Sequence, residues 1–236
     1  MIGNEIARRT SFIHRAANLR DIIGLLWRYA PYTFRIWLDL LPVLFFFGDF
    51  LRGRRKLQLY LAVKRGKFGL RDILFNYQGG PDAVNKYLHS LGIRECAVIH
   101  TENDMHKNLE FCYQNWTTPL AAAKLLEIFR NENLFDKEYK NFIYQTMVEC
   151  QTGQDRLIAP LLDKKVTMGH KTGTGDRNAK GQQIGCNDIG FILLPDGHAY
   201  SIAVFVKDSE ADNRENSEII AEISRIVYEY VTQQID

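Results

Sequence analysis

The stretch Val166–Asp176, VTMGHKTGTGD, decides the predicted fold of this chain. It begins with Val166–Met168, which has the composition of a β-strand, and continues into the triplet Lys171–Gly173 and a further glycine, Gly175. Glycines let a backbone approach a ligand closely, and a lysine, a hydroxyl and peptide N–H groups beside them suit an anionic substrate that contains a carbonyl. The triplet alone is unspecific, because a basic strand end followed by a turn also produces it.

Charge is distributed unevenly along the chain, whose 236 residues carry a net charge of +2. Residues 1–71 hold 14 basic and 4 acidic residues, a net charge of +10, whereas residues 72–236 hold 16 basic and 24 acidic residues, a net charge of −8. The overall composition is that of a soluble protein, long enough for one large domain or two small ones. The charge difference predicts two segments of different character, 1–71 and 72–236.

The cysteines and histidines show no spacing typical of a metal site. Cys96, Cys112, Cys150 and Cys186 have no C-x-x-C pattern, so we expect buried free thiols rather than disulfides or a zinc site. The six histidines contain no H-E-x-x-H motif. We therefore expect no metal and no cofactor, and we expect no nucleic-acid partner.

Residues 1–71 combine basic residues with a hydrophobic run, Ile36–Phe47. The run is shorter than the ~20 residues that a membrane span needs, and it contains Asp39 and Pro42. The basic cluster Arg52–Lys56 follows it, a combination typical of a segment that lies on an anionic membrane surface. A helical hairpin with a solvated basic face explains the same pattern. No secretory signal is recognisable.

Residues 72–236 alternate between helical and strand-like patterns. We expect residues 72–77 to end a helix, and four further helices: one that begins at Pro81, one that follows Thr118, one over 137–151 and one over 216–231. We expect three strands: 166–170, 188–194 and 200–206. Residues 97–113 have little periodicity, which predicts a long irregular loop, and loops of that length are usually functional.

Five stretches of this second segment resemble, in order and spacing, the class A serine β-lactamases, most nearly their cephalosporinase branch. The stretches are DILFNYQGGPDAVNKYLHSLGI (72–93), YQNWTTPLAAAKLLEIF (113–129), TGQDRLIAPLLDK (152–164), HKTGTGD (170–176) and NDIGFILLPDG (187–197). The resemblance implies an α+β fold like that of β-lactamases and penicillin-binding proteins, in which a helical cluster accompanies an antiparallel sheet covered by a carboxy-terminal helix. It also implies a β-lactam substrate and a periplasmic location. Residues 1–71 resemble no family.

The resemblance assigns roles to the residues of the triplet. Lys171, Thr172 and Gly173 correspond to the K-T-G motif of the family, in which the cation and the hydroxyl hold the substrate carboxylate and shape the electrostatics of attack. Lys171 is therefore expected to act in both binding and catalysis. The N–H of Thr174 corresponds to one arm of the oxyanion hole.

Three further residues match functional positions of the family. Arg156 corresponds to a position that supports carboxylate recognition, and Glu102 corresponds to the carboxylate that activates the deacylating water. His106 stands where the family usually has a water-holding asparagine. Without the resemblance, a solvated loop acid and a surface salt-bridge partner would be the simpler explanations of Glu102 and Arg156.

The motifs that carry the family's nucleophile are missing from these 236 residues. No serine is followed three positions later by lysine, and the family's spacing puts the S-D-N motif at Gly66–Phe68, which has the sequence GKF. The resemblance thus implies a truncated or fused form without the family's first two strands. Loss of a serine nucleophile costs on the order of a million-fold in turnover.

Two hypotheses follow from these patterns. The first is β-lactam hydrolysis by serine acylation and water-driven deacylation, for which this chain alone is expected to be inactive. The second is a non-catalytic fusion or relic whose basic segment, residues 1–71, binds a membrane surface or a partner.

Overall fold

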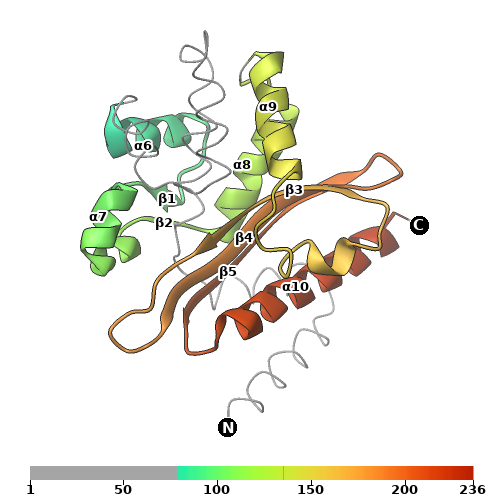
Figure 1. The fold of residues 1–236 in the computed structure, drawn as a ribbon. Helices are drawn as coiled ribbons and strands as arrows, with labels where there is room; N and C mark the ends of the chain where they lie inside the picture. The colour runs from blue at the N-terminus through green and yellow to red at the C-terminus, as the bar shows by residue number, and fades with distance from the viewer. Residues whose placement is uncertain (1–78, 135, 236) are drawn as a thin grey trace.

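The computed structural model of the protein describes residues 79–134 and 136–235, and the predictions for residues 1–71 lie outside this part of the chain. The described helices are α6 (Gly80–Ser90), α7 (Glu102–Lys107), η1 (Leu109–Tyr113), α8 (Pro119–Asn131), α9 (Lys137–Val148), η2 (Ala159–Leu161) and α10 (Asn213–Gln233) (Figure 1). None of these helices has the length and apolar character needed to cross a bilayer.

The central sheet has the three antiparallel strands that the sequence predicts, in the order β3-β4-β5. The strands are β3 (Thr167–Thr174), β4 (Gln183–Leu193) and β5 (Ala199–Ser209). Each is longer than predicted, because polar and glycine positions such as Gly185 and Asn187 interrupt the apolar pattern without interrupting the backbone pairing. β3 therefore contains the whole K-T-G triplet, with Thr172 paired to Asp188.

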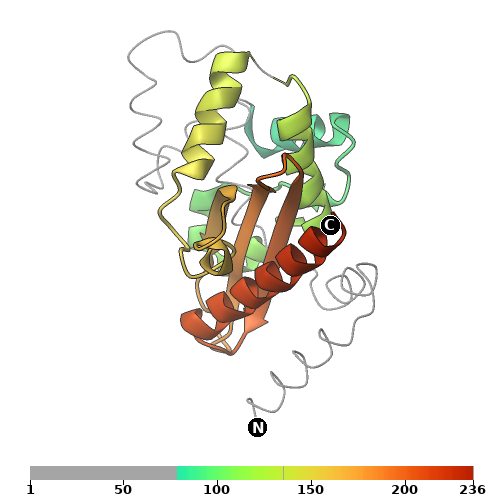
Figure 2. The ribbon, with the colours of Figure 1, turned by 90° about the vertical axis from the view of Figure 1, so that its right-hand side faces the viewer.

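Two apolar layers enclose this sheet, because successive strand residues point to opposite faces. On one face Ile189 and Phe191 of β4 join a core cluster with residues of α6, α8 and α9. On the other face Cys186 and Ile192 join a cluster with η2 and α10. Figures 1 and 2 show α10 along one face of the sheet and the helical cluster beyond the other. The predicted fold class is thus confirmed, whereas the predicted absence of two further strands depends on residues outside the described part.

The starts of α6 and α8 follow the predicted signals. Pro81 lies in the first turn of α6, and Gly92 follows the end of that helix with a positive φ of 76°. The hydroxyl of Thr118 accepts a hydrogen bond from the N–H of Ala121 and caps α8. At α10 the carboxylate of Asp212 caps the helix through a reciprocal capping box, so this helix begins three residues earlier than predicted.

The prediction of an irregular loop over 97–113 is wrong, since the segment contains α7 and η1. α7 has only six residues, too few for a recognisable apolar period. It is held by a capping box in which Thr101 Oγ1 accepts from the N–H of Asp104 and the Asp104 carboxylate accepts from the N–H of Thr101. A second, two-stranded sheet brackets it, formed by β1 (Cys96–Ala97) and β2 (Trp116–Thr117).

Gly169→Ala should destabilise the protein. A Cβ at this position would lie 2.3 Å from the Cζ of Phe191, a fully buried ring opposite it in the sheet. We expect the free energy of unfolding, measured by urea denaturation, to fall by about 1–3 kcal/mol. The double variant Gly169→Ala/Phe191→Leu should lose less than the sum of the two single variants. Additive effects, or a loss below about 0.5 kcal/mol for Gly169→Ala, would contradict this packing.

Candidate active site

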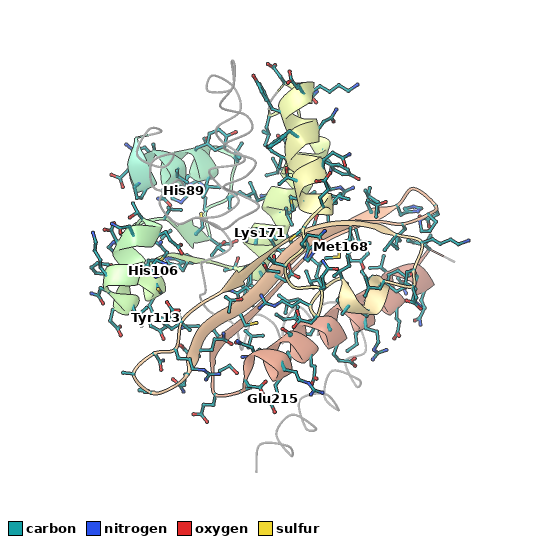
Figure 3. All side chains as sticks on the ribbon, in the orientation of Figure 1. His89, His106, Tyr113, Met168, Lys171 and Glu215 are labelled. Carbon is teal, nitrogen blue, oxygen red and sulfur yellow. The ribbon has the colours of Figure 1, made fainter. Side chains whose placement is uncertain are left out.

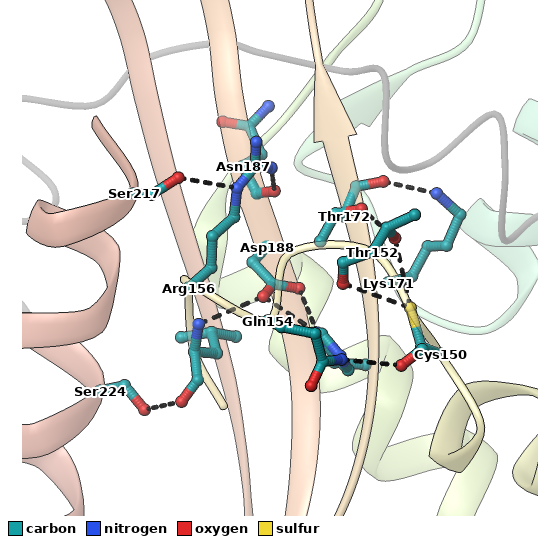
Figure 4. Close-up of polar contacts among 12 residues, drawn as sticks. Cys150, Thr152, Gln154, Arg156, Lys171, Thr172, Asn187, Asp188, Ser217 and Ser224 are labelled. Atoms are coloured by element: carbon teal, nitrogen blue, oxygen red, sulfur yellow. Dashed lines mark hydrogen bonds and ion pairs between the residues drawn. The ribbon is translucent and has the colours of Figure 1, made fainter. Parts of the chain in front are cut away.

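A buried arginine holds the end of the strand that carries the K-T-G triplet. The Nη1 group of Arg156 donates to the carbonyl oxygens of Gly173 at 3.2 Å and Asn187 at 2.8 Å, so the guanidinium bridges β3 and β4. Its Nη2 donates to Thr174 Oγ1 at 2.7 Å, and its Nε donates to Ser217 Oγ of α10 at 3.4 Å. Figure 4 shows Arg156 between α10 and the two strands. With 7% of its surface exposed, Arg156 is not a surface salt-bridge residue.

The hydroxyl of Thr172, in the triplet, is hydrogen-bonded to a residue of the segment that follows α9. Thr172 Oγ1 and Thr152 Oγ1 are hydrogen-bonded at 2.7 Å, and the ammonium group of Lys171 donates to the carbonyl oxygen of Thr172. Gly153 has a φ of 68°, and a Cβ there would lie 2.3 Å from Thr172 Cγ2, so only glycine fits. This close packing fixes the rotamer of Thr172. At Gly175 the nearest neighbouring atom belongs to the backbone: a Cβ there would lie 3.0 Å from the nitrogen of Gly185.

Glu102 and His106 both lie on α7, and Figure 3 shows His106 on this helix. Glu102 is the first residue of α7 and is 2% exposed, so it is not the solvated loop acid of the simpler explanation. His106 Nε2 lies 3.3 Å from Glu102 Oε1, and its Nδ1 lies 3.9 Å from Asp176 Oδ2. The imidazole thus stands between the buried carboxylate and the residue that ends the HKTGTGD stretch.

Asn115, a fully buried residue that the sequence analysis did not assign, fixes the segment before α7. Its Oδ1 accepts hydrogen bonds from the N–H groups of Ile99 and His100, at 2.7 and 2.9 Å. Its Nδ2 donates to the His100 carbonyl oxygen at 2.9 Å. A side-chain amide satisfies both backbone donors and an acceptor here, so Asn115 positions the turn that presents Glu102.

A second polar cluster lies behind the triplet, formed by Cys150, His170 and Asp188. Both carboxylate oxygens of Asp188 lie 3.0–3.1 Å from His170 Nδ1, and its Oδ2 also accepts from the N–H of Leu157 at 3.3 Å. Burial alone lowers the pKa of His170, but the hydrogen bonds and charges of Asp188 and Cys150 raise it to about 10. Sequence reasoning missed this cluster, because only the β3–β4 register brings His170 beside Asp188.

The structure brings the predicted site residues into contact in two groups. Arg156 is bonded directly to Gly173 and Thr174, and Lys171 to Thr172. A separate contact joins Glu102 to His106. His106 meets the end of β3 through Asp176, which the sequence analysis did not assign.

Comparison with known proteins places this arrangement in a family. The sequence profile of the β-lactamase enzyme family matches residues 71–231. A β-lactamase of Bacteroides uniformis is 42% identical over 182 residues, which are 77% of this chain and 61% of that protein. The extended-spectrum β-lactamase PER-1 of Pseudomonas aeruginosa is 39% identical over 164 residues, 70% of this chain and 53% of that protein. A solved class A β-lactamase from Bacteroides cellulosilyticus superimposes with a TM-score of 0.74 at 30% identity, covering 86% of this chain and 85% of that one.

The helical cluster, the antiparallel sheet and the covering helix α10 define the fold of the class A β-lactamases. The chain belongs to the β-lactamase enzyme family. It spans 61% and 53% of the lengths of the two curated relatives, less than two thirds of either.

Arg156→Lys should destabilise the protein strongly for a conservative change. A single ammonium group cannot replace the guanidinium bonds to two backbone carbonyls and two hydroxyls. Because each buried polar group left unsatisfied costs about 1–3 kcal/mol, we expect a loss of at least about 2 kcal/mol in urea unfolding. The matched control is Arg214→Lys, whose side chain is exposed on α10 beside Glu218. Equal losses of unfolding free energy for the two substitutions would contradict the role of Arg156 in holding β3, β4 and α10 together.

The raised pKa of His170 predicts a pH-dependent contribution to stability. The folded protein binds this proton more tightly than the unfolded chain, so the contribution is complete below a pH of about 6.5 and is lost as the pH rises toward the folded pKa of about 10. Cys150, whose pKa is lowered, titrates with the opposite sign, so the comparison is made in a Cys150→Ser background, in which Asp188 still raises the pKa of His170. Adding His170→Gln there should cost most at low pH and progressively less as the pH rises.

The control for this measurement is His198→Gln, because that histidine is exposed on the β4–β5 turn. A destabilisation by His170→Gln that stays constant or grows with pH would show that the folded protein does not hold the imidazolium.

Proposed function

We propose that this chain provides the carboxylate-binding strand and the deacylating carboxylate of a site that hydrolyses β-lactams. The supporting observation is that Arg156 fixes Gly173 and Thr174 through direct hydrogen bonds, on the strand that also carries Lys171 and Thr172. A cation, two hydroxyls and peptide N–H groups held on one strand are suited to a carboxylate beside a reacting carbonyl.

In this proposal Lys171 attracts the substrate carboxylate and the hydroxyls of Thr172 and Thr174 donate hydrogen bonds to it. The N–H of Thr174 faces the oxygen that becomes negative when the ring carbonyl is attacked. Arg156 acts as a positioning residue, because its donors are directed at protein oxygens. Its charge adds to the positive potential at the end of β3.

Glu102 takes the role of general base for deacylation. A carboxylate that is almost fully buried and has one neighbouring imidazole can remove a proton from a water molecule that attacks an acyl-enzyme. His106 would orient that water from the other side, where the family usually has asparagine. Asn115 supports both by fixing the turn before α7.

Serine acylation requires a nucleophile and an activating lysine that no S-x-x-K motif in the 236 residues supplies. We therefore propose that these residues alone do not turn over β-lactams and that hydrolysis requires an added segment with the S-x-x-K and S-D-N motifs. Cephalosporins are the proposed preferred substrates and the periplasm the proposed location. The non-catalytic alternative, membrane-surface binding by residues 1–71, concerns residues outside the described part of the chain.

Hydrolysis of a chromogenic cephalosporin tests the proposal. The purified 236-residue chain should show no turnover. A chimera in which residues 1–71 are replaced by an amino-terminal class A segment with S-x-x-K and S-D-N should hydrolyse the compound. In that chimera Lys171→Ala should lower kcat/KM at least about 100-fold, as loss of one transition-state donor does. Glu102→Gln should instead trap the acyl-enzyme, detected as a mass increase of the intact protein.

The matched control is Lys164→Ala, which removes a lysine whose ion pair with Asp163 lies at the surface. This variant of the chimera should keep full activity. Full activity of the Lys171→Ala chimera would contradict the proposed binding strand. Turnover by the unaltered chain that Lys171→Ala abolishes would show that another residue serves as the nucleophile.

A further inference from the structure

Asp208, near the end of β5, has an unusual backbone conformation. Within the described part of the chain it is the one residue other than glycine with a positive φ, at 48°. The pairing of β5 with β4 includes Lys207 and Ser209 on either side of it but is interrupted at Asp208 itself. A side chain in this left-handed region costs stability, and such residues persist where their surroundings hold them in place.

This conformation changes the face of the sheet to which the Asp208 side chain points. Successive strand residues point to opposite faces, and along β5 Phe205 joins the core cluster with α6, α8 and α9, whereas Val204 joins the cluster with α10. Regular alternation would therefore direct Asp208 toward α10. Its carboxylate instead contacts Tyr113 of η1, and the next residue, Ser209, bonds to α10. The positive φ thus reverses the alternation and turns the carboxylate toward η1.

The Asp208 carboxylate holds the last residue of η1. The hydroxyl of Tyr113 donates to Asp208 Oδ1 at 2.6 Å. Lys207 Nζ lies 3.3 Å from Asp208 Oδ2 and 5.1 Å from the centre of the Tyr113 ring. Burial, and after it the hydrogen bond to Asp208, raise the pKa of Tyr113, so the hydroxyl keeps its proton and remains the donor. The carboxylate therefore fixes the ring while the neighbouring ammonium group balances its charge.

The same hydroxyl also joins η1 to the loop between β3 and β4. Asn178 Nδ2 donates to the Tyr113 oxygen at 3.2 Å. Asn178 Oδ1 accepts from the N–H groups of Lys180 and Gln182, each at 3.0 Å, so this side chain also shapes the loop. The Tyr113 hydroxyl thus donates one hydrogen bond and accepts another, and η1, β5 and the β3–β4 loop meet at one oxygen atom.

Tyr113 lies at one end of the segment that carries Glu102. A single residue, Asn108, separates η1 from α7, and its side chain caps η1. At the other end of the segment, Asn115 binds the N–H groups before α7. The buried Glu102 carboxylate is therefore held between two fixed points, and a shift of Tyr113 is passed to α7 through one residue.

We propose that Asp208 is a positioning residue that, through Tyr113, anchors the segment carrying Glu102 to the end of the sheet. The role of Glu102 as the deacylating base rests on the function proposed above, whereas the anchor does not. The positive φ of Asp208 lowers stability but makes this contact, because regular strand geometry would point the carboxylate toward α10. Replacement of Asp208 should therefore release this segment in particular.

Amide hydrogen exchange of the 236-residue chain, measured for each residue by NMR, tests the anchor. Asp208→Gly removes the carboxylate but suits the positive φ, so it should be more stable in urea than Asp208→Ala, which keeps the strain. In Asp208→Gly the hydrogen-bonded amides of Met105, Phe111 and Gln114 should exchange at least about tenfold faster. Exchange at Phe191, in β4, should change by less than about threefold, because the relief of strain offsets the lost hydrogen bond.

Asp208→Asn is the matched control, because its amide oxygen still accepts from Tyr113, and its exchange at Met105 and in η1 should rise less than in Asp208→Gly. Tyr113→Phe removes the same hydrogen bond from the other side, and adding it to Asp208→Gly should produce little further increase. Unchanged exchange at Met105 and in η1 in Asp208→Gly would overturn the proposal. An equal rise at Phe191 would also overturn it, since Asp208 would then stabilise the whole fold and not one segment.

The cysteines provide a second readout. All four are thiols: Cys96 and Cys186 are buried, as the sequence predicts, whereas Cys112 and Cys150 are partly exposed. Cys112 precedes Tyr113 in η1 and packs against the core cluster, so release of η1 should speed its alkylation by iodoacetamide while Cys150 reacts at an unchanged rate. An unchanged Cys112 rate in both Asp208→Gly and Tyr113→Phe would contradict the anchor. Neither readout uses a β-lactam, so a failure of the proposed hydrolysis would leave both results as they are.

Discussion

The Arg156 guanidinium is the interaction on which the candidate site depends most. It is almost fully buried and donates to the backbone of β3 and β4, to Thr174 and to Ser217 of α10. A charge in this position is stable because all three nitrogens of its planar donor group donate to oxygens. Removal of any one acceptor would leave part of a buried cation unsatisfied. The end of the K-T-G strand, its neighbour and the covering helix are therefore fixed together.

The segment that carries Glu102 contacts both β5 and the residues that follow β3. Tyr113 at the end of η1 donates its hydroxyl to Asp208 of β5 at 2.6 Å, and Lys207 lies over its ring. His106 bridges Glu102 and Asp176 from α7. These contacts place the buried carboxylate relative to β3. A conformational change in residues 97–113 would therefore move Glu102 and would also disturb the contact between His106 and Asp176 after the K-T-G strand.

The sequence predicts the elements of the described fold better than their extents. Strong local signals, such as Pro81 at the start of α6 and the Thr118 cap of α8, identify the helices correctly. α7 is missed because a six-residue helix stabilised by a capping box has no apolar period. β4 is predicted short because Gly185 and Asn187 are not typical strand residues. Pairing with β5 keeps Gly185 extended, and pairing with both β3 and β5 keeps Asn187 extended.

Some candidate site residues could be recognised in the sequence, and others could not. Lys171 and Thr172 stand in a contiguous motif that can be recognised along the chain, and Glu102 and Arg156 are recognised only through the family. Asn115 and the pair of His170 and Asp188 could not be predicted, because their partners are 10 to 31 positions away in the sequence. Such contacts carry no local signal in the sequence.

The central claim is that the K-T-G strand recognises the carboxylate of a β-lactam, whether or not a nucleophile is present. It is tested most directly by titration of the isotope-labelled 236-residue chain with a cephalosporin, with amide chemical shifts followed by NMR. The account predicts saturable shifts at the amides of Thr172, Gly173 and Thr174, where the backbone is already fixed by Arg156. A folded chain in which these amides do not shift, or in which shifts are confined to other regions, would contradict it.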